Sequence, residues 1–341
     1  MTQIGQTITY RYLTVLYRGR AITLALQLPR AEQLHQSCSA AVDFILEQQD
    51  SDGAWRDFSL WVGSSGPWLT GIIGRALLEP DSSVSLTKEH PALVRARDWL
   101  HQVERASAGG WGFSEDTWVD ADSTASAVLF LAKWSDLDNE RLADLLRTFQ
   151  RDDGGIACFR MADGVPDAWK ASHADVTAVA GLAAARLGDR SSAEAAKDYC
   201  LQCLEVEGPV ASHFWRSSVY TPAMTAYLLF HTNDIRYKHL SRIALSFSST
   251  LETALSLILA VHSGAPIQDC AEKILNAQLS DGSWPASCQM SSPTSLRPWT
   301  QANGFGGYRM RFADHKRLFA TALSLLALSC ALKLTESECS G

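Results

Sequence analysis

Apolar residues recur along most of the chain with the spacing expected of amphipathic helices. Between residues 33 and 48 the apolar side of such a helix consists of Leu34, Cys38, Ala41, Phe44 and Ile45. Few stretches alternate between apolar and polar residues as strands do, and residues 1–30 show no clear pattern. Further helices are predicted near residues 89–105, 123–136, 139–150, 175–187, 192–206, 219–231, 249–263, 266–278 and 316–332. The pattern therefore predicts a mostly helical protein.

A short turn motif separates several of these helices. Residues 49–55 read Gln-Asp-Ser-Asp-Gly-Ala-Trp, and residues 278–284 read Gln-Leu-Ser-Asp-Gly-Ser-Trp. Residues 150–156 keep the pattern with Ile in place of Trp, whereas residues 109–111 keep only two glycines and the aromatic residue. The Asp-Gly pair favours a tight turn, the Gln can bond backbone groups at a helix end, and the Trp can pack on the neighbouring hairpin. We therefore interpret these repeats as scaffold.

The repeating unit is a helical hairpin that occurs about six times. One hairpin cannot bury its apolar face alone, but a closed ring of inner and outer helices buries all of these faces without special end repeats. The sequence therefore predicts an all-α fold, namely an α/α barrel of the α6-α6 type. We expect the barrel to span residues 31–335, after an N-terminal segment 1–30 that is a candidate lid and before a tail, residues 336–341.

Composition fits a globular protein. The 341 residues are 46% apolar and 20% charged, which is enough apolar material for a large core. The net charge of −7 gives no indication of a nucleic-acid partner. The eight cysteines are scattered, and we interpret Cys200 and Cys203 as two thiols of one helix, so a reducing, cytoplasmic location is expected. Residues 1–30 contain no stretch typical of a transmembrane helix or secretory signal, while peripheral membrane contact and a homodimer stay open.

Two carboxylates stand one residue apart just before the apolar run from Ala125 to Trp134. They are Asp120 and Asp122, and aromatic residues crowd the sequence before them. Acidic side chains beside aromatic surface suit a site that protonates an apolar molecule and then stabilises the resulting cation. The alternative is a helix N-cap, for which this arrangement of Asp, Ser and Thr is also suited.

Together, the Gln-x-x-Asp-Gly-x-Trp repeats and the segment Asp120-Ala-Asp-Ser-Thr-Ala125 resemble the class II terpene cyclases, of which the squalene–hopene cyclases are the best-known branch. In that family the repeats tie the hairpins of α/α barrels, and the middle Asp of Asp-x-Asp-Asp-Thr-Ala donates a proton. The resemblance therefore implies that Asp122 is the general acid. Ser123 replaces the last Asp of the family's motif, and we expect it to hydrogen-bond the acid pair.

A second segment, Asp175-Val-Thr-Ala, resembles the family's Asp-Val-Thr-Ala-His, whose Asp and His support the acid. Val179 stands where that His would be, and His173 is the candidate substitute. The resemblance implies that Asp120 and Asp175 tune Asp122, because burial and neighbouring carboxylates raise the pKa of a carboxyl group.

Several aromatic segments also resemble parts of the family's substrate pocket, at residues 109–113, 214–220, 306–312 and 319–322. Aromatic faces stabilise a carbocation by roughly 0.5–2 kcal/mol each when water is excluded. The pocket is therefore expected to be lined by Trp111, Phe113, Trp118, His173, Trp215, Tyr220, Tyr308, Phe312 and Phe319. Simple core packing is the alternative for the aromatic residues near the C-terminus.

Basic residues lie beside the C-terminal aromatic segment. Arg309, Arg311 and Lys316 could recognise an anionic head group, such as a diphosphate or a carboxylate, or could form a solvated face. The chain also departs from the larger family members, because it spans only the acid-bearing barrel and lacks the second barrel that usually covers the pocket.

These observations predict a single-barrel, class II-type terpene cyclase acting on a polyprenyl or prenylated (meroterpenoid) substrate, with no metal or other cofactor for the protonation step. Protein prenyltransferases have a related fold, but their zinc ligands would fall on Glu252, Ala254 and Ala320, two of which cannot bind a metal. Two alternatives stay open. One is a non-catalytic barrel that binds a hydrophobic ligand or a partner protein, and the other is a different acid- or base-catalysed cyclisation on the same fold.

Overall fold

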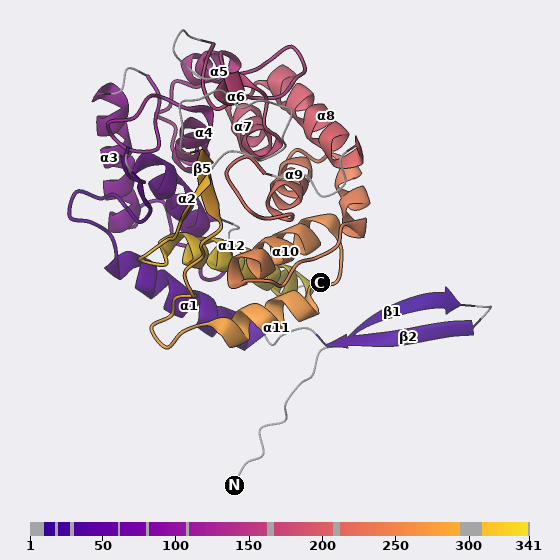
Figure 1. The fold of residues 1–341 in the computed structure, drawn as a ribbon. Helices are drawn as coiled ribbons and strands as arrows, with labels where there is room; N and C mark the ends of the chain where they lie inside the picture. Colours follow the sequence, from indigo (N-terminus) through magenta and orange to yellow (C-terminus); the bar gives the residue numbers. More distant parts are fainter. Residues whose placement is uncertain are drawn as a thin grey trace.

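The computed structural model describes residues 10–17, 20–27, 31–60, 62–79, 82–106, 109–161, 167–206, 212–293 and 309–339. Within these ranges the chain is mostly helical, as the sequence predicts (Figure 1). One 3-10 helix, η1, covers Ile235–Arg242. The α-helices are α1 (Ala31–Glu47), α2 (Pro67–Leu78), α3 (Pro91–Ala106), α4 (Ala121–Leu131), α5 (Asn139–Arg147), α6 (Asp167–Lys170), α7 (Ala174–Leu187), α8 (Arg190–Val206), α9 (Tyr220–His231), α10 (Thr250–Ser263), α11 (Gln268–Ala277) and α12 (Leu318–Cys339).

Six inner helices form a closed ring. Helix α2 packs against α4, α4 against α7, α7 against α9, α9 against α10, α10 against α12, and α12 returns to α2. These helices are buried over most of their length, whereas α1, α5 and α11 bury only one side. Helices α1, α3, α5, α8 and α11, together with η1, lie outside the ring (Figure 1). The predicted α/α barrel of the α6-α6 type is therefore confirmed.

Helix α2 is the inner helix that the hydrophobic pattern did not predict. It begins at Pro67 and contains Gly71 and Gly74, residue types that usually indicate turns in a sequence. A Cβ atom on Gly71 would lie 2.5 Å from the backbone of Ser126 in α4, and one on Gly74 would lie 2.5 Å from the ring of Phe130. The two glycines therefore let α2 and α4 approach closely. This role depends on a neighbouring helix, so the spacing of residues along the sequence cannot reveal it.

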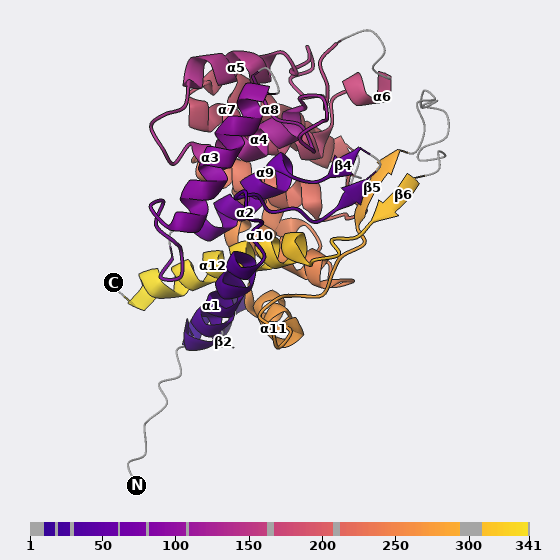
Figure 2. The same cartoon turned by 90° about the vertical axis from the view of Figure 1, so that its left-hand side faces the viewer.

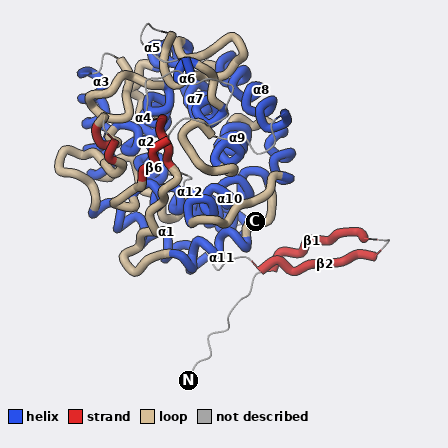
Figure 3. Tube along the Cα trace, viewed as in Figure 1, coloured by secondary structure: helices blue, strands red, loops and turns tan. Residues whose placement is uncertain are grey.

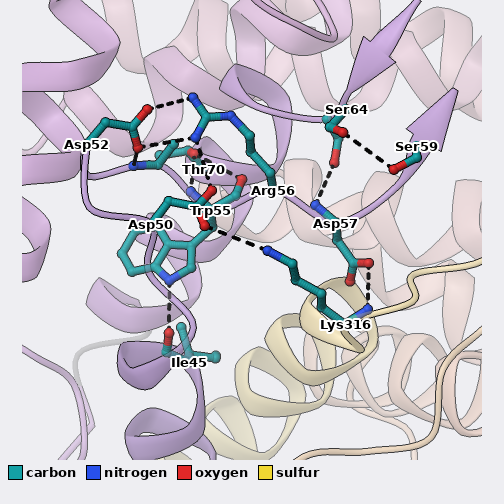
Figure 4. A network of polar contacts seen from close by, with 12 residues as sticks. Ile45, Asp50, Asp52, Trp55, Arg56, Asp57, Ser59, Ser64, Thr70 and Lys316 are labelled. Atoms are coloured by element: carbon teal, nitrogen blue, oxygen red, sulfur yellow. Dashed lines mark hydrogen bonds and ion pairs between the residues drawn. The ribbon is translucent and has the colours of Figure 1, made fainter. Parts of the chain in front are cut away.

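Buried tryptophans tie the repeat turns to the outer helices that precede them. The indole N–H of Trp55 donates to the carbonyl of Ile45 at 2.8 Å (Figure 4), and that of Trp284 donates to the carbonyl of Ile274 at 2.8 Å. Both side chains are fully buried. The backbone N–H of Trp55 also donates to the hydroxyl of Thr70 in the following inner helix, at 3.0 Å. These contacts confirm the interpretation of the repeats as scaffold.

Glutamines of the same motif bridge consecutive hairpins. Nε2 of Gln49 donates to the carbonyl of Gly53 in its own turn and to that of Ala92 at the start of α3, both at 2.8 Å. In the last repeat, Nε2 of Gln278 donates to the carbonyl of Ser37 in α1 at 2.8 Å. This contact joins the last hairpin to the first and closes the ring.

Short antiparallel strands complete the described structure, and Figure 3 shows them in red. The pairs are β1 (Tyr10–Tyr17) with β2 (Arg20–Gln27), β3 (Ser59–Leu60) with β4 (Gly63–Ser64), and β5 (Met290–Pro293) with β6 (Arg309–Phe312). The first pair falls in the segment for which the sequence shows no clear pattern. Figure 2 shows β4, β5, β6 and α6 gathered at one end of the barrel, the end at which α12 begins.

Helix α12 is long and apolar enough to cross a membrane when judged by length and composition alone. However, 89% of its apolar stretch, Leu318–Ser337, is buried inside the protein. It packs against α1, α2 and α10 as a member of the inner ring. Its apolar character is therefore explained by its position in the core.

Candidate active site

Asp120 caps helix α4. Its Oδ1 accepts a hydrogen bond from the backbone N–H of Ser123 at 2.7 Å, and its Oδ2 accepts one from the Ser123 hydroxyl at 2.8 Å. Both residues are buried. Asp120 is therefore the N-cap residue, a role that the sequence left open for this motif. Ser123 was expected to hydrogen-bond the acid pair, and both of these hydrogen bonds join it to Asp120.

Asp122 lies in the first turn of α4. Part of the residue's surface is exposed to solvent, but protein atoms surround its carboxyl group. Burial raises the pKa of this carboxyl group well above its usual value, and the negative charges of Asp120 and Asp175 raise it further. The indole N–H of Trp68 lowers the pKa of Asp122, although it forms no hydrogen bond of good geometry within the described residues. The effects that raise the pKa of Asp122 outweigh the one that lowers it, so the carboxyl group strongly favours its protonated form.

The neighbouring carboxyl groups are perturbed in the same direction. Burial raises the pKa of Asp120 to about 7, and the hydrogen bonds from Ser123 oppose the rise. Burial also raises the pKa of Asp175, against the charge of His173. Because each negative charge disfavours ionisation of the next group, the three carboxyl groups titrate as a linked set.

Asp175 connects α7 to the segment that leads into α9. Its Oδ2 accepts a hydrogen bond from the backbone N–H of Phe214 at 3.0 Å. Its Oδ1 is buried and has no hydrogen-bond partner within the described residues. Val179, which takes the place of the family's supporting His, is buried in α7. A histidine that supports the acid, as in the family, must therefore occupy another position in this chain.

Two histidines lie close to this position. The rings of His173 and His213 stack with their centroids 3.6 Å apart. The sequence indicates His173 as a substitute for the supporting His, and its charge does lower the pKa of Asp175. Sequence reasoning missed His213, which directly precedes the aromatic segment that begins at Phe214. A histidine next to a recognised segment is the signal that could have found it.

An aromatic cluster stands beside the acid. The rings of Trp215 and Phe319 stack with centroids 4.6 Å apart, and Trp215 stacks on Tyr220 at 5.0 Å. Trp68 stacks on Phe319 at 5.3 Å and on Phe113 at 6.1 Å. Four predicted pocket residues are thus brought together, and Trp68 joins them from α2 as the member nearest to the acid. The sequence did not indicate Trp68, because the helix that carries it was not predicted.

Other predicted pocket residues lie elsewhere. Trp111 is fully buried, and its indole N–H donates to the carbonyl of Leu100 at 2.9 Å, as the tryptophans of the repeats do. Trp118 is 66% exposed and meets only the edge of the Phe159 ring, at 6.2 Å, among the aromatic rings of the described residues. Phe312 is buried in β6. The remaining one, Tyr308, lies outside the described residues.

The predicted basic cluster is divided. Arg311 is exposed in β6, and Arg309 begins that strand. Lys316 pairs with Asp50 at 3.6 Å, and its backbone N–H donates to Asp57 at 2.8 Å, so it helps to fix the start of α12 (Figure 4). Recognition of an anionic group stays a prediction; Arg311 and Lys316 are both exposed, but Lys316 is paired with Asp50.

One group within the described residues could hold a metal ion. The ligand atoms of Cys158, His173 and His213 all lie within 4.8 Å of one another. The sequence indicated none of the three as a metal ligand. His173 lies two residues before Asp175, and the carbonyl of Cys158 accepts a hydrogen bond from the N–H of Ala121 at the start of α4, so the group adjoins the acidic residues.

A closed ring of helical hairpins, with a buried acid at the start of one inner helix, is an α/α barrel, and solved type II terpene cyclases share this fold. The resemblance to class II terpene cyclases stated from the sequence is therefore confirmed for the fold.

Solved structures support this assignment. The type II terpene cyclase MstE from Scytonema matches with a TM-score of 0.73 and 23% identity, over 90% of this chain and 100% of that chain. A protein from Actinoplanes matches with a TM-score of 0.72 and 23% identity, over 87% of this chain and 99% of that chain. The ent-copalyl diphosphate synthase from Streptomyces platensis matches with a TM-score of 0.52 and 18% identity, over 77% of this chain and 50% of that chain.

Variants of MstE have been solved in complex with geranylgeranyl dihydroxybenzoate, as substrate, and merosterolic acid A, as product. At these levels of identity the similarity to this chain shows the fold. No family model matches the sequence, and the search of curated proteins found no match.

Proposed function

We propose that the protein is a class II-type terpene cyclase that starts carbocation cyclisation by protonating an alkene from Asp122. The observation that carries the proposal is a carboxyl group with a strongly raised pKa, Asp122, beside stacked aromatic rings. A general acid must hold its proton at the working pH, and burial among carboxylates provides this property.

The first step transfers one proton. The π electrons of the terminal isoprene unit form a new C–H bond with the proton of Asp122, which leaves a carboxylate on the protein and a tertiary cation on the substrate. The first turn of α4 favours the carboxylate, because backbone N–H groups at a helix start carry partial positive charge. The indole N–H of Trp68 acts in the same direction.

The aromatic cluster would stabilise the cation as rings close. Each desolvated aromatic face contributes roughly 0.5–2 kcal/mol to the binding of a cation. Trp68, Trp215 and Phe319 are stacked and buried, so their positions are fixed before a substrate binds. The reaction ends when the cation loses a proton from carbon to water, or when a hydroxyl group of the substrate captures the cation and passes its proton to water. Water then returns a proton to the carboxylate of Asp122.

We infer that the substrate is a prenylated aromatic acid or a similar polyprenyl compound. The support is the similarity of the whole barrel to MstE, whose substrate is a geranylgeranyl dihydroxybenzoate. The exposed guanidinium group of Arg311 in β6 is the candidate partner for a carboxylate of such a head group. The length of the prenyl chain is left to the assay below.

The test compares Asp122→Asn with the wild type, because Asn keeps the shape of Asp and removes the acidic proton. Prenylated dihydroxybenzoates of several chain lengths serve as substrates. We expect kcat to fall about 10²–10⁴-fold, the usual contribution of a positioned general acid, and substrate affinity to change little. Asp116→Asn, at an exposed carboxylate before the same helix, is the matched control and should keep full activity.

Reaction in deuterated water supplies a second readout. Wild-type product should carry deuterium at the terminal isoprene unit, where the proton of the acid is delivered. A fully active Asp122→Asn protein, or a cyclised product without this deuterium, would remove Asp122 from the mechanism. The alternative of a different acid- or base-catalysed cyclisation on the same fold would then be favoured. If the protein bound these compounds tightly but converted none of them, a non-catalytic binding barrel would be favoured.

A further inference from the structure

Three metal-ligating side chains from separate parts of the chain meet near Asp175. Cys158 follows the repeat turn at residues 150–156, His173 precedes α7, and His213 precedes α9. Their ligand atoms lie within 4.8 Å of one another. His173 also acts on the carboxyl group of Asp175, but neither that role nor the repeat scaffold accounts for a cysteine sulfur gathered with two imidazoles.

Hydrogen bonds link the segments of Cys158 and His173, while the segment of His213 is bonded to α7 through Asp175. The carbonyl of Cys158 accepts a hydrogen bond from the N–H of Ala121 at 2.9 Å, and the N–H of His173 donates to the carbonyl of Ile156 at 3.1 Å. Cys158 is 1% exposed and His213 is 8% exposed, whereas His173 is partly exposed. The group is therefore mostly enclosed, and His173 stands at its accessible side.

The separation of the ligand atoms suits a tetrahedral ion. Zinc bonds of about 2.0–2.3 Å to nitrogen and sulfur place neighbouring ligand atoms about 3.3–3.8 Å apart. The ligand atoms lie within 4.8 Å of one another, so they must move closer together by about 1–1.5 Å to bind one zinc ion. The stacked rings of His173 and His213, at 3.6 Å, would have to turn apart, because one ion cannot lie between the nitrogens of parallel rings in contact.

Asp175 stands beside this group, since its Oδ2 accepts a hydrogen bond from the backbone N–H of Phe214, the residue after His213, at 3.0 Å. In addition, Oδ1 of Asp175 is buried without a hydrogen-bond partner within the described residues. A buried carboxylate oxygen without a donor is costly unless a cation or water satisfies it, which is an observation independent of the three ligands.

We propose that Cys158, His173 and His213 form a zinc-binding site. One thiolate and two imidazoles are the ligands that Zn²⁺ binds with high affinity, while Mg²⁺ and Ca²⁺ require oxygen ligands. The ion would join the segments that precede α4, α7 and α9, since the backbone of Cys158 is bonded to the start of α4. It serves to fix these segments around the acid and takes no part in the proton transfer.

The first experiment measures metal content. The full-length protein is stripped with a chelator, loaded with Zn²⁺, freed of excess metal and assayed by elemental mass spectrometry. We expect about one zinc per chain for the wild type, little in Cys158→Ser and His213→Gln, and a higher unfolding temperature with zinc than without. The matched controls are Cys203→Ser and His315→Gln, which change a cysteine and an exposed histidine elsewhere and should bind zinc fully.

The second experiment replaces zinc by Co²⁺, whose absorption reports the ligands. A near-ultraviolet sulfur-to-cobalt band together with strong visible bands is expected for the wild type, and the sulfur band should disappear in Cys158→Ser. His173→Asn provides a variant at a partly exposed position if the buried substitutions fail to fold, as judged by circular dichroism. Absence of stoichiometric zinc in the wild type, or full zinc binding by folded Cys158→Ser or His173→Asn, would overturn the site.

Discussion

Asp120 and Asp122 are separated by one residue but occupy different environments. Both oxygens of Asp120 are held by Ser123 in the geometry of a helix cap. Asp122 instead faces the aromatic residue Trp68, and burial and the charge of Asp120 keep its proton in place. The same short motif thus provides a helix cap and the candidate proton donor.

This division of roles predicts the pH dependence of activity. The charge of Asp120 raises the pKa of Asp122, so Asp120→Asn should lower that pKa and move the alkaline limb of the kcat profile to lower pH. Activity needs protonated Asp122, so it is lost as pH rises through the pKa of Asp122, and this loss should begin earlier in the variant. Profiles of kcat against pH for wild type, Asp120→Asn and Asp116→Asn measure the effect; identical alkaline limbs for all three would contradict it.

The candidate acid could be identified from the sequence alone, whereas its surroundings could be identified only in part. Asp122 and Asp175 belong to continuous motifs, which can be recognised without knowing the fold. Trp68 and His213 reach the site only because α2 and the segment before α9 become neighbours of α4 and α7 in the ring. Contacts of this kind depend on ring closure, so no local pattern in the sequence reports them.

At the scale of the elements, the repeat tryptophans carry the hairpin packing. Trp284 is fully buried and hydrogen-bonded, whereas Trp118 is 66% exposed. Trp284→Ala should therefore lower the free energy of unfolding by about 3–5 kcal/mol, and Trp118→Ala should change it by less than about 0.5 kcal/mol. Chemical denaturation of both variants provides the comparison. Similar small losses for the two would mean that the repeats do not hold the hairpins together.

The close contact between α2 and α4 gives a second prediction at this scale. Gly71→Ala adds a methyl group that would lie 2.5 Å from the backbone of Ser126, so one helix must move. Ala is the better helix former by about 1 kcal/mol, yet overpacking typically costs about 1–3 kcal/mol, and we expect a net loss of stability. Since α4 carries Asp122, the variant should also lose activity under conditions in which it is fully folded. An equally stable or more stable variant would show that the helices have room to adjust.

The contact between α2 and α4 also explains why one of the inner helices was not predicted from the sequence. Hydrophobic spacing and the Asp-Gly turns predicted most helices and the barrel, because each repeat unit is encoded locally. Helix α2 was missed since Gly71 and Gly74 serve the packing of a neighbouring helix rather than a turn. Strands β1 (Tyr10–Tyr17) and β2 (Arg20–Gln27) pair with each other, although the sequence of that region gave no clear indication of strands.

For the whole molecule, the proposed chemistry requires a closed site, because a carbocation must be kept away from water. The N-terminal segment is the candidate lid, and the barrel itself is complete from α1, which starts at Ala31. Deleting residues 1–25 should leave the unfolding temperature unchanged while lowering turnover or increasing the share of hydroxylated products formed by capture of water. Unchanged turnover and products in a monomeric truncated protein would rule out this lid.

Ring closure also has a consequence for the synthesis of the protein. The carboxylate of Asp57 accepts a hydrogen bond from the backbone N–H of Leu318, 261 residues later, at 2.8 Å. Helix α2 likewise packs against α12, the last helix of the chain. At about 5–20 residues per second, a ribosome needs roughly 13–50 s to make the intervening segment. During that time the apolar side of α2 has no partner from α12, so the nascent chain offers a binding surface for chaperones until its final helix emerges.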